Sequence, residues 1–169
     1  MNDVVNSLLI ATCGNIMASD DAFGPMVARD LRQIRRPEVE VVELDIRPAS
    51  LLDHLPGHRG LILVDAVRLP GHQPGHLIDI DWFSPGRPPL VNDDTMSTHG
   101  LSLASQIQLA RKLGLLPGFV RLIGYVLADP PRVGLPPAPG LVRQVVNAAD
   151  LIRRHADVFN AEHREPAYA

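Results

Sequence analysis

The sequence predicts an α/β fold in which helices cover a mostly parallel sheet. Short apolar runs alternate with segments whose apolar residues recur at helical spacing, the order typical of strand–helix units. The run at 60–64, Gly-Leu-Ile-Leu-Val, is apolar throughout, as expected of a central strand buried on both faces. The length of 169 residues suits one domain with a real core. We expect a single domain over 1–159 and a flexible tail over 160–169.

The first half of the chain predicts three strands and two helices. Residues 7–12 form an apolar run that ends at the turn signal Cys13-Gly14-Asn15. Asp20 and Asp21 precede a helix, where its dipole favours negative charge, and Pro25 is tolerated in its first turn. Apolar residues recur at helical spacing at Phe23, Met26, Val27, Leu31 and Ile34. The next elements are a strand at 39–44, a short helix at 50–55 and the central strand at 60–64, which ends at Asp65.

The second half continues the alternation through two proline-rich stretches. Residues 76–83 are expected to form a strand and 84–94 an irregular segment. A helix is predicted from Thr98, with Leu103, Ile107, Ala110 and Leu113 on one face, and a strand follows at 119–126. Residues 128–140 carry too many prolines for regular structure. A C-terminal helix is marked by Leu141, Val145, Ala149 and Ile152.

Composition excludes several classes of function. The formal net charge of −3 gives no electrostatic case for binding nucleic acid or an anionic membrane. No segment is long and apolar enough to span a bilayer, and the first residues lack the basic region of a signal peptide. The one cysteine, Cys13, excludes an internal disulfide and suits a reducing cytoplasm. Few aromatic residues and no readable dimer patch lead us to expect a monomer.

Three polar residues are candidates for a site at the carboxyl ends of the strands, where open α/β sheets bind ligands. Asp21 follows the first strand, Asp65 follows the central run, and His99 precedes the predicted helix. Together they would make an incomplete metal site with open positions. Each also has an ordinary structural explanation: Asp21 favours a helix start, Asp65 caps a turn, and His99 is a first-turn histidine with a satisfied hydrogen bond.

Other residues give weaker signals. Cys13 with His99 and Asp65 would make a cysteine hydrolase triad, although a lone cysteine is more often a small buried hydrophobe. Four histidines cluster around loops and are expected to be solvated rather than metal-binding: His54, His58, His72 and His76. Gly14 precedes a helix, but neither nucleotide-binding glycine motif is present.

An ordered set of motifs resembles the hydrogenase maturation proteases. The segment 14–24 carries the Gly-Asn, Asp-Asp and final glycine of their opening signature, Leu63-Val64-Asp65-Ala66 is similar to their central Val-Asp-Ala, and Ser97-Thr98-His99 to their histidine segment. Pro74-Gly75, Ile123-Gly124 and Gly134-Leu135-Pro136 also fit. The resemblance runs from about Leu8 to His155.

The resemblance implies a twisted five-stranded sheet with helices on both sides. It also implies an endopeptidase that removes the C-terminal extension of a nickel-iron hydrogenase large-subunit precursor. In this family the residues that contact the nickel correspond to Asp21, Asp65 and His99. The nickel would arrive with the substrate, so no permanently bound cofactor is expected. The carboxylates must be ionised and His99 neutral to act as ligands, so activity should fall as the pH drops through the histidine range.

The sequence departs from the family pattern at two places. Thr12 replaces the usual glycine and is expected to stiffen the turn out of the first strand. Asp45-Ile46-Arg47-Pro48 replaces a glycine-rich stretch that would help fit the substrate tail, which indicates an unusual hydrogenase class. Two other functions stay open: a non-catalytic checkpoint or chaperone that binds the same precursor, and the cysteine hydrolase of Cys13 and His99.

Overall fold

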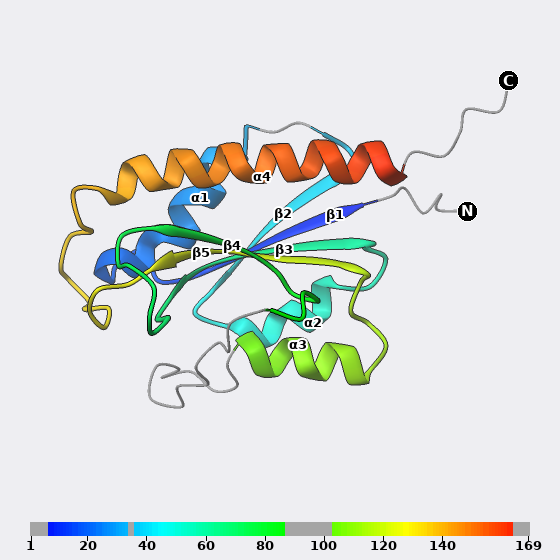
Figure 1. Cartoon of the computed structure of the whole chain (residues 1–169), viewed down its shortest axis with the longest axis horizontal. Helices are drawn as coiled ribbons and strands as arrows, with labels where there is room; N and C mark the ends of the chain where they lie inside the picture. The colour runs from blue at the N-terminus through cyan, green and yellow to red at the C-terminus, as the bar shows by residue number, and fades with distance from the viewer. Residues whose placement is uncertain (1–6, 34–35, 87–102, 164–169) are drawn as a thin grey trace, which may run out of the picture.

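A five-stranded sheet forms the centre of the molecule in the computed structural model, which describes residues 7–33, 36–86 and 103–163 (Figure 1). Its strand order is β2-β1-β3-β5-β4. The strands are β1 (Leu8–Cys13), β2 (Val39–Asp45), β3 (Gly60–Val67), β4 (Leu77–Asp81) and β5 (Phe119–Val126). The first three and β5 run parallel, while β4 pairs antiparallel with the outer edge of β5. The mostly parallel sheet predicted from the sequence is confirmed.

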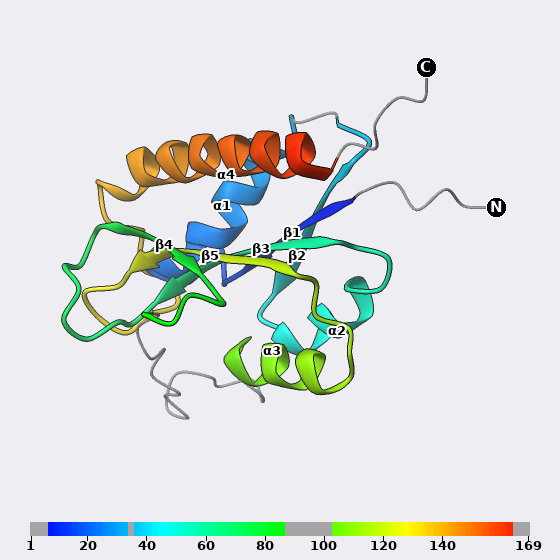
Figure 2. The same cartoon turned by 45° about the vertical axis from the view of Figure 1, so that its right-hand side comes forward.

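Helices cover both faces of the sheet, so the molecule has three layers (Figures 1 and 2). One face carries α1 (Phe23–Leu31) and the long α4 (Leu141–His163), and the opposite face carries α2 (Leu51–His54) and α3 (Leu103–Lys112). Two 3₁₀ turns, η1 (Ser19–Ala22) and η2 (Pro48–Ser50), precede α1 and α2.

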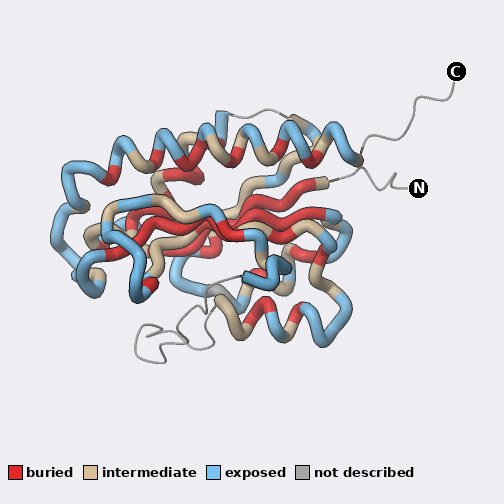
Figure 3. Tube along the Cα trace, viewed as in Figure 1, coloured by how far each residue is buried: buried red, intermediate tan, exposed pale blue. Residues whose placement is uncertain are grey.

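Strand alternation sends side chains into two separate cores. Leu8 and Ile10 of β1 face α1 and α4, whereas Leu9, Ala11 and Cys13 face α2 and α3. Both sets are buried because β1 lies between two strands and two helical layers, as the burial of the central strands in Figure 3 shows. The continuous apolar runs noted in the sequence are therefore strands covered on both sides.

Several boundaries differ from the expectations. The central strand does not end at Asp65 but continues to Val67, because Asp65 pairs with Gly124 of β5. Cys13, expected to begin the turn, is instead the last residue of β1. The C-terminal helix runs to His163, into the segment expected to be a tail, where Asn160 donates a hydrogen bond to Glu38 (3.0 Å).

Besides its backbone pairing with β5, the edge strand β4 is held by the carboxylate of Asp79. Asp79 accepts hydrogen bonds from Arg121 of β5 (2.8 Å) and pairs with His155 of α4 (2.8 Å). Burial opposes ionisation of Asp79, but these two partners outweigh it and lower its pKa. Within the described residues, no helix is long and apolar enough to cross a membrane.

Candidate acidic site at the carboxyl ends of the strands

Two glycines allow the loop after β1 to fold tightly onto the start of α1. A Cβ at Gly24 would lie 1.8 Å from the carbonyl oxygen of Cys13. A Cβ at Gly14, which has a φ of +134°, would lie 2.2 Å from the carbonyl oxygen of Asp21. Both distances are far inside van der Waals contact, so only glycine fits at either position. The glycines of the 14–24 motif thus fix where Asp21 is held.

Asp21 and Asp65 lie on elements that pack against each other, and the charge of Asp21 acts on Asp65. Asp21 lies in η1, which packs against β3, and its carboxylate accepts a hydrogen bond from the backbone N–H of Asn15 (2.8 Å). Asp65 lies in β3 on the face of Leu61 and Leu63 because side chains alternate along a strand. Both residues are partly buried. Two partly buried carboxylates therefore lie at the carboxyl ends of β1 and β3, near enough for the charge of one to act on the other.

The pKa values of both carboxyl groups are raised, chiefly because burial disfavours their ionised forms. Burial raises the pKa of Asp65 from 3.8 to about 8, the charge of Asp21 adds to the rise, and the Ala66 N–H opposes it. Burial also raises the pKa of Asp21, against the stabilising hydrogen bond from Asn15. A cation between the two carboxylates would relieve both the burial cost and their mutual repulsion.

Cys13 lies beside the two carboxylates but is not equipped as a nucleophile. Its side chain is 3% exposed. Burial raises the pKa of its thiol well above the usual value, and the charges of Asp65 and Asp21 raise it further. The reactive thiolate is therefore disfavoured, which argues against the cysteine hydrolase and for a small buried hydrophobe.

His99 lies outside the described residues, so its place as the third ligand stays a prediction. Within the described part of the chain, no group of three or more histidine, cysteine, aspartate and glutamate residues could hold a metal ion. This includes the four loop histidines. The expectation that all four are solvated is wrong for His58, whose ring is 10% exposed and hydrogen bonds Glu40 (3.0 Å).

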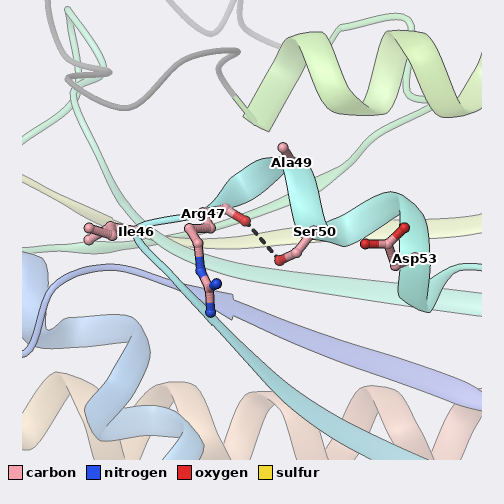
Figure 4. A pocket seen from close by; sticks show the side chains of 5 residues that line it. All are labelled: Ile46, Arg47, Ala49, Ser50 and Asp53. Atoms are coloured by element: carbon pink, nitrogen blue, oxygen red, sulfur yellow. Dashed lines mark hydrogen bonds between the residues drawn. The ribbon is translucent and has the colours of Figure 1, made fainter.

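A shallow surface pocket of about 470 Å³ lies beyond the end of β2, at the departure from the family pattern (Figure 4). It is lined by Ile46, Arg47, Ala49, Ser50 and Asp53. Ser50 donates its hydroxyl to the Arg47 carbonyl (2.8 Å), which holds the turn into α2. Asp45 ends β2 with a φ of +50°, and its carbonyl accepts the N–H of Gly14 (2.9 Å). The pocket therefore adjoins the loop that carries Asp21, although neither Asp21 nor Asp65 lines it.

The proline-rich loop at 128–140 docks onto η1 and the loop before it, a contact that the sequence did not reveal. The carboxylate of Asp20 accepts a hydrogen bond from the backbone N–H of Ala138 (2.6 Å). The hydroxyl of Ser19 accepts one from the backbone N–H of Arg132 (3.1 Å). Asp20 thus holds the 128–140 loop in place, while its neighbour Asp21 belongs to the candidate acidic site. Sequence alone gave only a weak signal for this, namely that the Gly134-Leu135-Pro136 motif recurs in the family.

The fold and the site together define an open α/β protein with a paired-carboxylate site at the carboxyl ends of its parallel strands. The chain belongs to the hydrogenase maturation protease family, whose model matches residues 25–155. The match includes Asp65 and His99 and begins shortly after Asp21. Among curated protein sequences, none matches the chain.

Solved structures with this fold include several maturation peptidases. An endopeptidase from Escherichia coli has 22% identity and a TM-score of 0.76, with coverage of 94% of this chain and 95% of that one. The hydrogenase maturating endopeptidase HybD from E. coli has 20% identity and a TM-score of 0.70, covering 89% and 92%. A hydrogenase 2 maturation peptidase from Thaumarchaeota archaeon SCGC_AB-539-E09 has 26% identity and a TM-score of 0.64, covering 89% and 97%. These likenesses agree with the predicted five-stranded fold.

Proposed function

We propose that this protease is an endopeptidase that removes the C-terminal extension of a nickel-loaded nickel-iron hydrogenase large-subunit precursor. The nickel is part of the substrate, and Asp21, Asp65 and His99 recognise it. The observation that carries the proposal is the pair of partly buried carboxylates at this end of the sheet: burial raises the pKa of both, and the charge of Asp21 raises that of Asp65 further. Such a pair favours a cation that arrives with open coordination positions.

The position of α3 supports the role of His99. This helix begins at Leu103, four residues after His99 in the sequence, and covers the face on which Cys13 and Asp65 lie. It ends near the start of β5, so its first turn is directed toward the carboxyl ends of the parallel strands (Figure 1). The helix that follows His99 in the sequence thus points toward the edge of the sheet that carries the two carboxylates.

The substrate nickel has two roles in this proposal. Ligands from the protease enter its free positions only after the metal has been inserted, so binding reports that loading is complete. The same contacts hold the scissile segment beside the acidic site, which supplies positioning. The protease itself needs no resident metal. The pocket at 46–53 is suited to take part of the extension, because it adjoins the loop of Asp21.

We also propose that the protein is a monomer and works in the cytoplasm, where its single cysteine, Cys13, would stay reduced. Asp21→Ala, Asp65→Ala and His99→Ala test the site, with the exposed Asp129→Ala as matched control. Mass spectrometry of the loaded precursor should show shortening by the wild type and the control, and none by the three site variants. Full cleavage by any site variant would remove that residue from the site. Stable binding by the wild type without cleavage would instead identify a checkpoint protein.

A further inference from the structure

Two neighbouring loops expose four large apolar side chains beside the acidic site. Ile16 is 40% exposed, Met17 64%, Val133 74% and Leu135 50%. We call these four residues the two-loop patch. They come from the loop after β1 and from the loop between β5 and α4, which lie together at one end of the sheet (Figures 1 and 2). Clustered exposed apolar residues on a folded protein indicate an interaction surface.

Backbone hydrogen bonds join the two loops into one surface. The N–H of Gly134 donates to the carbonyl of Met17 (2.9 Å), and the N–H of Ser19 donates to the carbonyl of Leu135 (3.1 Å). Together with the bonds of Ser19 and Asp20 described above, they hold the patch in place before any partner binds. A preformed surface loses little conformational entropy on binding.

The position of the patch identifies its partner. Asp21 accepts the N–H of Asn15 (2.8 Å), the residue before Ile16, so patch and site share one loop. A peptide that reaches Asp21 and Asp65 must bring the protein that carries it over these loops. Stable interfaces bury roughly 800 Å² on each partner and centre on apolar anchors, which two carboxylates alone do not provide. A second copy of this chain is a poorer partner, because it would cover the site.

We propose that the two-loop patch of Ile16, Met17, Val133 and Leu135 is the docking surface for the folded body of the hydrogenase large-subunit precursor. This inference rests on the proposed function and extends it. The patch binds the precursor outside its scissile segment, so it contributes equally to the bound substrate and to the transition state. Removing it should therefore weaken binding and leave the chemical step unchanged.

The test is steady-state cleavage of nickel-loaded precursor by the double variant Met17→Ser/Leu135→Ser. The matched control is Val158→Ser on α4, where the valine is 51% exposed and Leu135 is 50%. We expect the double variant to raise KM by about 10-fold or more, with kcat within about twofold of wild type. The control should keep both values. If the double variant does not fold, Val133→Ser alone serves, because that side chain is the most exposed of the four.

Three results would overturn the inference. An unchanged KM in the double variant would exclude this surface from docking while leaving the proposed cleavage intact. A wild type that neither binds nor cuts the precursor would refute the proposed function, and with it the assignment of this partner. In sedimentation velocity, a wild-type dimer that the double variant splits would assign the patch to self-association instead.

Discussion

Asp65→Asn should stabilise the protein at alkaline pH while abolishing its function. The raised pKa means that folding favours the protonated carboxyl. Asp65 therefore contributes most to the free energy of unfolding below pH 4. This contribution is lost as the pH rises toward the pKa of about 8 that Asp65 has in the folded protein. Each pKa unit corresponds to about 1.4 kcal/mol, so the rise from 3.8 gives an upper bound of about 6 kcal/mol. Because Asp65 is partly exposed, water should reduce this to about 2–4 kcal/mol.

Urea unfolding at pH 4.5, 7 and 9 measures this effect. The difference in unfolding free energy between Asp65→Asn and wild type should grow with pH, because only the wild type must bury an ionised Asp65. The exposed Asp129→Asn provides the control, and its difference from wild type should not change with pH. A pH-independent difference for Asp65→Asn, or a loss of stability that grows with pH, would refute the argument that Asp65 is destabilised by burial beside Asp21.

Three further predictions concern residues around the acidic site. Gly24→Ala should cost about 3 kcal/mol or more in urea unfolding, because its methyl group would meet the Cys13 carbonyl, whereas Gly118→Ala, with nothing within 4 Å, should cost less than about 1 kcal/mol. Asp20→Ala should speed hydrogen exchange of the Ala138 N–H by about 10-fold, since it removes a hydrogen bond worth about 1–2 kcal/mol, and Asp20→Asn, which keeps an acceptor, should have a smaller effect. Cys13→Ala should keep precursor cleavage within about twofold of wild type, because the thiol pKa is raised; loss of cleavage in a folded variant would restore the cysteine hydrolase.

Hydropathy patterns predicted the layers of the fold because burial imposes them directly. A strand covered on both faces must be apolar throughout, as Leu61 to Val64 are, and amphipathic helices must repeat every three to four residues. The same patterns could not locate the end of β3. Asp65 interrupts the apolar run, yet its backbone still pairs with Gly124, and pairing depends on a neighbouring strand that local sequence does not specify.

The two acidic residues of the site were predictable from topology, and their charge state was not. Parallel strands end at the same edge, so we expected Asp21 and Asp65, which lie near the ends of β1 and β3, at that edge. Their raised pKa values depend on how many atoms exclude water from each carboxylate, which only the packed structure determines. The docked loop at 128–140 was also beyond sequence reasoning, because Asp20 and Ala138 are distant in the chain. The proposed ligand role of His99 still rests on the family resemblance.

The most direct test of the account is to incubate the wild-type protein with its precursor in nickel-loaded and nickel-free forms and to measure precursor mass over time. The loaded precursor should lose its C-terminal extension while the nickel-free precursor stays intact. Equal cleavage of both forms would contradict the claim that Asp21 and Asp65 recognise nickel carried by the substrate.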